Sequence, residues 1–392
     1  MKLLLAVGAA ALLCGCAGKL QENAPEIQTK MDYTQQKLYG EYKLNEPVGI
    51  AFYIIQGDEE LFLTTGMLKT VSADSHYRIA SVTKNFYSAA IMLLAQENKL
   101  DLDAKLTDLM IGSDQPYVPD TPEFNIPYKE QISIRQLLNH TSGIGDIINQ
   151  EIPADLDVPY AGCDYTDYMM EQTPDYQFTA ANLMQVQNDS KLKYGEPGAG
   201  MFYSNMGYAL VALIVERVSG MPHEEFIKQR FLTPNNLTAT SIVTAGNEQE
   251  LPLPALEGYR FNKKNKRFVP GTRRNASVFV GSGNMVSTPR DIAKWMKLLF
   301  SGNTAVHLAS VQQMLPPPER DYGYGTVRFN RNLGYGHNGA FRGYFSYAYY
   351  NPATDTAWVL ITNFYDNDNF GRQIELLTEL QTDVMLLLNP ED

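Results

Sequence analysis

The chain has few cysteines, with three among its 392 residues, at positions 14, 16 and 163. Cys14 and Cys16 end an apolar N-terminal run, so Cys163 alone remains for the rest of the chain, and no disulfide is expected within the folded part. A lone cysteine could act as a nucleophile. Cys163 has no histidine near it in the sequence, and we interpret it as an ordinary residue.

Histidine and basic residues are also scarce. The five histidines, at positions 76, 140, 223, 307 and 337, show no spacing typical of zinc ligands, and nothing in the sequence predicts a metal or an organic cofactor. Lysine and arginine together number 32 against 44 aspartates and glutamates, which gives a formal charge of −12. Nucleic-acid binding needs a basic face, so this partner is not expected. After the N-terminus, no apolar run is long enough to span a bilayer.

The N-terminus has the order of features found in a bacterial lipoprotein signal. A positive start is followed by a short apolar run that ends in Leu13-Cys14-Gly15-Cys16, which resembles a lipobox. We therefore predict a signal peptide over residues 1–15, diacylation of Cys16 and a polar tether over residues 16–29, leaving 377 residues with a charge of −13. An ordinary secretory signal with accidental cysteines is the alternative. Ala17 after the cysteine favours the outer membrane, at the periplasmic face of the cell envelope.

Hydrophobic periodicity places strands at both ends of the chain and helices between them. We expect strands at residues 48–55, 60–65, 322–329, 342–350 and 357–363, and helices at 31–42, 81–96, 132–139, 208–218, 291–300 and 374–388. The predicted fold class is α/β (α+β), with one antiparallel sheet built from both chain ends, flanked by helices, and an inserted, mainly helical lobe. The sheet lobe would comprise residues 30–80 and 278–392, and the helical lobe residues 81–277, with a catalytic cleft between them.

A Ser-x-x-Lys motif, Ser81 to Lys84, opens the most apolar of the expected helices. This spacing puts the hydroxyl and the amine on one helix face, one turn apart. A serine attacks a carbonyl only when a base removes its proton, and burial lowers the pKa of a lysine toward that task. A second copy of the motif, Ser190 to Lys193, lies in a polar segment, and we expect Ser190 to face solvent and to be inert.

Two further motifs follow in order, Tyr203-Ser204-Asn205 and His337-Asn338-Gly339. With the Ser-x-x-Lys motif they form a three-part pattern that resembles the class C-like branch of the serine β-lactamase and penicillin-binding-protein superfamily, which includes esterases and D-aminopeptidases. The stretches 77–80, 137–143 and 283–288 are similar to that family too, so the resemblance spans roughly residues 30–388.

The resemblance implies a role for each matching residue. Ser81 would form an acyl-enzyme, and Lys84 and Tyr203 would share the task of general base in an order that the family leaves open. A cationic Lys84 would lower the pKa of Tyr203. Asn205 would hydrogen bond Lys84 or the substrate amide. The backbone N–H groups of Ser81 and Ala340 would form the oxyanion hole.

Several of these residues also have simpler interpretations. Tyr203 could be a packed aromatic residue, although Asn205 at the right offset favours the catalytic interpretation. A histidine beside a strand is usually at the surface, and Gly339 could mark a bulge or turn. Arg342 could line the cleft, but a solvated charge is the simpler interpretation.

The chain departs from the family pattern at His337, where β-lactamases and D,D-peptidases usually have lysine. A neutral imidazole holds a substrate carboxylate less well, so the resemblance favours hydrolysis of ester bonds, or of amide bonds in small molecules or D-amino-acid peptides. A β-lactamase or D,D-carboxypeptidase, with Arg342 as the substitute cation, remains an alternative. So does a non-catalytic surface lipoprotein that binds a peptide or glycan.

Overall fold

The computed structural model describes residues 19–330 and 333–389. The predicted signal peptide and Cys16 lie outside the described residues. Among the helices of the described ranges, none combines the length and the apolar character needed to cross a membrane.

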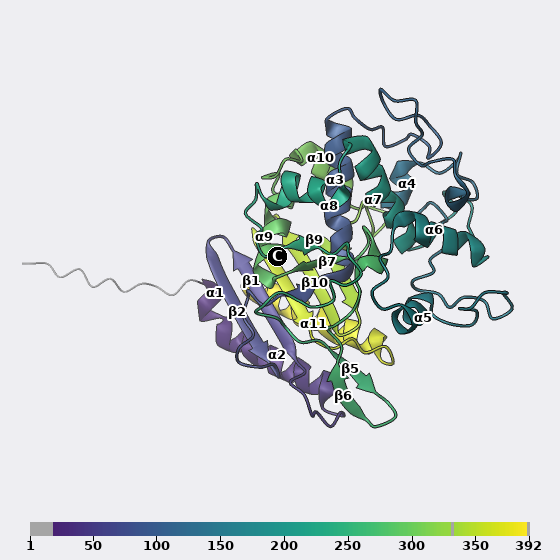
Figure 1. Cartoon of the computed structure of the whole chain (residues 1–392). Helices are drawn as coiled ribbons and strands as arrows, with labels where there is room; N and C mark the ends of the chain where they lie inside the picture. Colours follow the sequence, from purple (N-terminus) through teal and green to yellow (C-terminus); the bar gives the residue numbers. More distant parts are fainter. Residues whose placement is uncertain (1–18, 331–332, 390–392) are drawn as a thin grey trace, which may run out of the picture.

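A six-stranded antiparallel sheet forms the centre of the molecule (Figure 1). Its strand order is β2-β1-β11-β10-β9-β8, so the N-terminal hairpin pairs with the last strand of the chain. This confirms the predicted fold class. The strand bounds are β1 Ile50–Gln56, β2 Glu59–Thr65, β8 Val327–Phe329, β9 Gly334–Phe341, β10 Tyr344–Asn351 and β11 Thr356–Thr362.

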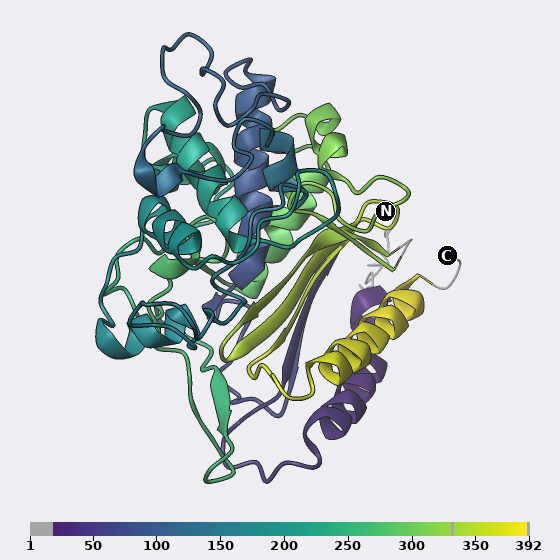
Figure 2. The same cartoon turned by 90° about the vertical axis from the view of Figure 1, so that its right-hand side faces the viewer.

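The two ends of the chain cover one face of this sheet (Figure 2). The helices are α1 (Lys19–Glu22), α2 (Ala24–Tyr39) and α11 (Phe370–Leu388), and α2 lies against α11. The tether predicted for residues 16–29 is wrong for residues 19–29. Ile27 and Met31 share one face of α2 by their spacing, and both are buried, as is Leu20 of α1. Fully burying such side chains stabilises the fold by about 1.5–3 kcal/mol each.

The other face of the sheet carries the central helix α3 (Thr83–Gln96) and the helices that surround it. Every residue of α3 from Thr83 to Leu94 is buried, as its all-round apolar sequence predicted. The other helices are α4 Ile134–Leu138, α5 Tyr165–Gln172, α6 Ala180–Asp189, α7 Asn205–Ser219, α8 His223–Ile227, α9 Pro289–Phe300 and α10 Leu308–Met314. Short helical turns occur at η1 Ala80–Val82, η2 Pro122–Phe124, η3 Lys228–Leu232 and η4 Ser277–Phe279.

Two small sheets lie outside the central one. One has the order β3-β7-β4, and the other is the β5-β6 hairpin. Their bounds are β3 Tyr77–Arg78, β4 Ser241–Ile242, β5 Tyr259–Asn262, β6 Arg267–Pro270 and β7 Met285–Ser287. The predicted lobe boundaries stay a prediction, but β4 to β6 show that the middle of the chain also contains strands.

One predicted strand is shorter in the structure, and one strand had no predicted bounds. The strand expected over residues 322–329 is confined to β8, because Gly325 has a φ of +55° and the Gly323 N–H bonds back to Thr326 O, which makes residues 322–326 a turn. The strand β9 had no predicted bounds, since its glycines interrupt the apolar alternation. At Gly336 a Cβ would meet Ala348 O at 1.9 Å, so the close approach of β10 requires glycine there.

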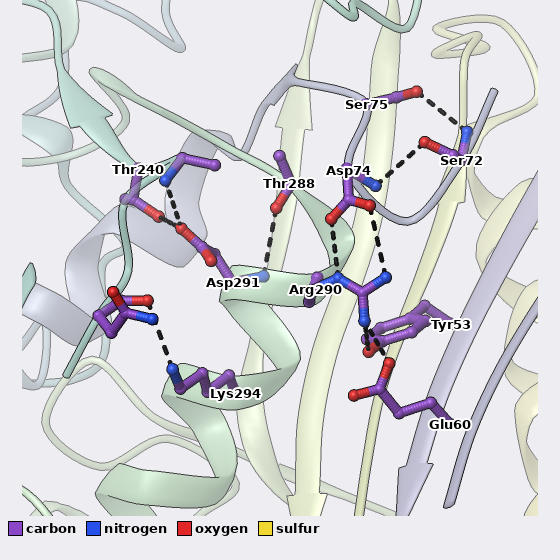
Figure 3. Close-up of polar contacts among 12 residues, drawn as sticks. Tyr53, Glu60, Ser72, Asp74, Ser75, Thr240, Thr288, Arg290, Asp291 and Lys294 are labelled. Atoms are coloured by element: carbon purple, nitrogen blue, oxygen red, sulfur yellow. Dashed lines mark hydrogen bonds and ion pairs between the residues drawn. The ribbon is translucent and has the colours of Figure 1, made fainter. Parts of the chain in front are cut away.

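The start of α9 is tied to distant segments by a polar network at the surface (Figure 3). Arg290 donates to Asp74 Oδ1 at 2.7 Å and to Tyr53 Oη at 3.0 Å, and it pairs with Glu60. The adjacent Asp291 accepts from the Ala239 N–H and the Thr240 hydroxyl, each at 2.9 Å. These contacts join the β1-β2 hairpin and the segments before β3 and β4 to one helix end.

Candidate active site

Ser81 lies in the helical turn η1, directly before α3. The preceding residue, Ala80, has a φ of +48°, a left-handed conformation that costs a residue with a Cβ roughly 1–3 kcal/mol. Strand β9 packs tightly against this turn, because a Cβ on Gly339 would meet Ile79 O at 2.2 Å. Gly339 is therefore neither a bulge nor a turn residue. It is the position where strand and nucleophile turn come into backbone contact.

The Lys84 amine lies beside the serine and is fully buried. Its Nζ is 3.2 Å from Ser81 Oγ and 2.8 Å from both Asn205 Oδ1 and Ser282 O. Burial lowers the pKa of Lys84 to about 7, although the nearby Asp146 carboxylate raises it. A neutral amine has two N–H groups, which Asn205 and Ser282 accept. Its lone pair is then left for the Ser81 hydroxyl.

Asp146 fixes the orientation of Asn205 through two hydrogen bonds. Its Oδ2 accepts from Asn205 Nδ2 at 2.9 Å and from the Asn205 N–H at 3.1 Å. Asn205 can therefore present only its carbonyl oxygen to Lys84. Burial raises the pKa of Asp146, and the hydrogen bonds from the Asn205 and Ile148 N–H groups oppose this. Asp146 was not among the predicted site residues.

Tyr203 is placed by the start of helix α7. Ser204 caps this helix by accepting from the Gly207 N–H at 3.2 Å, and its hydroxyl donates to Gly145 O at 2.9 Å. Lys84 Nζ lies 4.7 Å from the centroid of the Tyr203 ring. Burial raises the pKa of Tyr203 well above its usual range, and a hydrogen bond with Ser81 opposes this only in part. The pKa of Tyr203 is therefore raised, where the resemblance implied a lowering by Lys84, and desolvation by burial is the main cause.

A chain of buried hydrogen bonds runs from His140 through Tyr322 to His337. The Ser204 N–H donates to His140 Nδ1 at 3.1 Å, so a neutral His140 carries its proton on Nε2 and donates it to Tyr322 Oη at 3.1 Å. The Tyr322 hydroxyl then donates to His337 Nε2 at 2.9 Å, and His337 Nδ1–H donates to Asn338 O at 2.6 Å. These donors and acceptors set the tautomer of both imidazoles.

His337 is buried, so the interpretation as a surface residue is wrong. Burial, together with the nearby Lys84, lowers the pKa of His337 to about 3. The pKa of His140 is also lowered well below its usual value by burial, then by Lys84 and by His337. Both rings are therefore neutral at physiological pH, and the third motif presents no cation.

A cavity of about 310 Å³ opens onto Ser81. Tyr203 and Asn205 line it together with the nucleophile, and so does Ala340. Strand β8 pairs with β9 only as far as Gly336, whereas β10 pairs with β9 as far as Phe341. The predicted oxyanion hole at Ser81 and Ala340 stays a prediction.

A scan against protein-family models matches residues 43–381 to the model described as Beta-lactamase. The chain belongs to the beta-lactamase family. Penicillin-binding protein 4* of Bacillus subtilis (strain 168) is 25% identical over 292 residues, which cover 70% of this chain and 58% of that protein. Protein flp of Staphylococcus aureus (strain N315) is 29% identical over 182 residues, 46% of this chain and 30% of that protein. The chain thus matches about a third to somewhat more than half of the length of these relatives.

Solved structures of this beta-lactamase fold include two amide hydrolases. The D-amino acid amidase of Ochrobactrum anthropi SV3, complexed with L-phenylalanine, superposes with a TM-score of 0.70 at 21% identity and covers 92% of this chain and 98% of its own. The D-stereospecific amidohydrolase of Streptomyces sp. gives 0.68 at 21% identity, covering 89% and 97%. At this identity the likeness establishes the fold.

Three other residues singled out in the sequence do not line the cavity at Ser81. Arg342 pairs with Asp167 of α5 and lines cavities other than the one at Ser81, so it does not replace the missing cation of the family motif. Ser190 is buried and donates to Gln187 O at 2.7 Å, so the prediction that it faces solvent is wrong. Cys163 is a free, exposed cysteine.

The residues that could hold a metal do not belong to this site. Among the described residues, one group of possible ligands was found, Glu216, His223 and Glu224, with ligand atoms within 4.8 Å of one another. His223 Nδ1 already has a hydrogen-bond partner, the Tyr87 hydroxyl at 2.6 Å. None of the three lines the cavity at Ser81.

Two residues of the site, Asp146 and Tyr322, were not predicted from the sequence, for different reasons. Asp146 follows the family-like stretch 137–143 by three residues, and its carboxylate becomes significant only through the long-range contact with Asn205. Tyr322 is one of 24 tyrosines and was assigned to a strand. A Tyr-Gly-Tyr-Gly sequence at 322–325 was the available signal, because closely spaced glycines indicate a turn rather than a strand.

Proposed function

We propose that the chain is a serine hydrolase that cleaves ester or amide carbonyls through an acyl-enzyme at Ser81. The observation that carries this proposal is the Lys84 amine, 3.2 Å from Ser81 Oγ, with a pKa lowered to about 7. A base of this pKa is half neutral near physiological pH, which suits general-base catalysis.

The geometry favours Lys84 as the first base. Neutral Lys84 accepts the Ser81 proton while Oγ attacks the carbonyl carbon. The resulting ammonium is stabilised by Asn205 and Ser282, both already in hydrogen-bond contact. Tyr203 starts as a neutral phenol, since burial raises its pKa, and it can pass its proton to the leaving group, which leaves a phenolate that takes a proton from the attacking water in the second step. Water would then release the acyl group by the reverse of these transfers.

Amide or ester hydrolysis is favoured over action on penicillins. Substrates of the latter type carry a carboxylate, and the residue of the third motif, His337, is neutral with its Nε2 occupied by Tyr322. The two structural relatives are named as a D-amino acid amidase and a D-stereospecific amidohydrolase, which supports a D-aminopeptidase-like or esterase-like activity. The match to Penicillin-binding protein 4* supports a second candidate function, which is hydrolysis of cell-wall peptides or of penicillins.

The test is active-site labelling of the protein from Lys19 onward with a fluorophosphonate, measured by intact mass. Single labelling of the wild type, absent in Ser81→Ala, together with turnover of p-nitrophenyl acetate, is the expected result. Ser190→Ala is the matched control, because it removes the serine of the other Ser-x-x-Lys motif and should label as the wild type does. Absence of labelling would contradict the proposal, and nitrocefin turnover that depends on Ser81 would favour the second candidate.

We further propose that the full chain is anchored by lipid at Cys16 to the bacterial cell envelope, on the periplasmic side of the outer membrane. The support is the order of charge, apolar run, small residue and cysteine at the N-terminus. Palmitate labelling of the expressed full chain, lost in Cys16→Ser but kept in Cys14→Ser, tests it. A wild type that takes up no palmitate and is recovered in the soluble fraction would contradict the anchor.

A further inference from the structure

The cavity at Ser81 has walls without formal charge. Among the residues that the structure describes, its lining combines the reacting groups with aromatic rings and amides, and every lining side chain is neutral when Tyr203 is a phenol. The rings Phe279 and Phe341 pack together with centroids 5.1 Å apart, and Phe370 and Val327 add apolar surface. A charged group of the substrate would lose its water here and gain no partner of opposite charge, which is costly.

Three charged side chains bonded or adjacent in sequence to lining residues, Lys84, Asp146 and Arg342, already have partners. Lys84 makes three hydrogen bonds behind Ser81, and Asp146 is buried against Asn205 and Asn149. Arg342 pairs with Asp167 and lines other cavities. A free α-ammonium group and a carboxylate therefore each lack a counter-charge at this wall.

We infer that the acyl group accepted by Ser81 is uncharged, so that both free amino-acid ends and carboxylates are disfavoured. This inference rests on the proposed hydrolase function and narrows its substrate class. Of the two activities proposed above, it favours the esterase-like over the D-aminopeptidase-like one, because an enzyme that selects a free amino terminus would need a carboxylate in the cavity, and the described lining has none. It also separates the chain from an enzyme that selects a terminal carboxylate, which would need a fixed cation.

Asn338 provides a direct test of the charge of this wall. It is half-buried and lines the cavity, and its backbone carbonyl, rather than its side chain, accepts from His337. Asn338→Asp and Asn338→Lys thus place opposite charges at one position of the cavity without removing a hydrogen bond that holds His337.

The experiment compares three p-nitrophenyl esters of similar length, the hexanoate, the 6-aminohexanoate and the adipate monoester. For the wild type we expect kcat/KM for both charged esters to be lower than for the hexanoate by about ten- to a hundredfold. A charge that enters the cavity stays unpaired, and water that still reaches it reduces the penalty. Asn338→Asp should raise the ratio of 6-aminohexanoate to hexanoate, and Asn338→Lys the ratio of adipate to hexanoate.

Either of two results would overturn the inference. One is a wild type that cleaves a charged ester as fast as the hexanoate. The other is a pair of Asn338 variants that still label with the fluorophosphonate but leave both ratios unchanged. A wild type that does not label at all would instead refute the proposed function, so the two failures are distinguishable.

Discussion

Two polar networks of this molecule each surround one cation, and they differ in burial. Around Lys84, the partners Ser81, Asn205 and Ser282 are drawn from three parts of the chain, and the amine has no exposure to solvent. Around Arg290, the partners also come from separate segments, but the side chain is 41% exposed (Figure 3). Both networks reach far along the sequence, up to 198 positions at Lys84 and 237 at Arg290, so the contrast between them lies in their exposure to solvent.

Burial decides whether a basic side chain can give up its proton near neutral pH. At Lys84 desolvation lowers the pKa to about 7, which makes proton transfer possible near neutrality. At Arg290 the pKa is raised by the hydrogen bond to Asp74, and the group stays a permanent cation that ties segments together. The buried network therefore supports chemistry at a cost in stability, whereas the exposed one adds little to stability and no proton transfer.

The largest effect is expected from Lys84→Met, which removes the amine and keeps an apolar side chain of similar length. We expect kcat for p-nitrophenyl acetate to fall by about 10²–10⁴-fold, the usual contribution of a general base. In the wild type, kcat/KM should rise with pH through about 7, where Lys84 loses its proton. Initial rates from pH 5 to 9 check both statements. Retained activity in the variant would show that Tyr203 alone serves as base.

The same variant also tests the cost of burial. The folded pKa of Lys84 lies below its unfolded value of 10.5, so the unfolded state binds more protons between pH 7 and 10.5 and the wild type gains stability as pH rises through that window. Lys84→Met lacks this gain. Urea unfolding of both proteins at pH 7 and pH 10 should show the wild type gaining on the variant, and equal pH dependence would contradict the lowered pKa.

Asp146→Asn is expected to have the next largest effect. The new amide places a donor against the Ile148 N–H or the Asn205 donors, so we expect a loss of stability of about 1–3 kcal/mol. Because the Asp146 carboxylate raises the pKa of Lys84, its removal should move the rising limb of kcat/KM to lower pH. If Asp146 has only a structural role, the variant will be less stable but the rising limb of kcat/KM will stay at the same pH. Asp101→Asn, at a position outside the cavity lining, is a control for loss of a carboxylate.

Tyr322→Phe should have a smaller effect on activity and a clear spectroscopic signature. It leaves His337 Nε2 without a donor and His140 Nε2–H without an acceptor, for a cost of about 1–3 kcal/mol in unfolding free energy. Nitrogen NMR of the imidazoles should show His337 neutral at pH 6, with its proton on Nδ1, and should show a shift of its Nε2 signal in the variant. A protonated His337 at pH 6 would contradict the buried, neutral chain of hydrogen bonds.

The sequence predicted features that rest on local spacing. Ser81 and Lys84 lie one helix turn apart, and the apolar run around them required a buried helix, as the structure confirms. Contacts between distant segments were beyond such reasoning. Asp146 acts through a residue 59 positions away, and Arg290 joins segments that no periodicity connects. Helix α1 and the start of α2 were missed because most of their residues are polar and only a few apolar ones are buried.

The smallest effect is expected from Arg290→Met, which removes the cation of the exposed network. The pairs with Asp74 and Glu60 are between half-exposed side chains, and exposed ion pairs contribute about 0–1 kcal/mol each. Asp291, whose carboxylate binds Ala239 and Thr240, still holds the start of α9 in the variant. We therefore expect a loss of at most about 1–2 kcal/mol, smaller still in high salt, and unchanged kcat. Urea unfolding at low and high salt measures the first, and ester hydrolysis the second. A larger, salt-independent loss, or a fall in kcat, would show that the exposed network also positions the buried one and would remove the contrast between them.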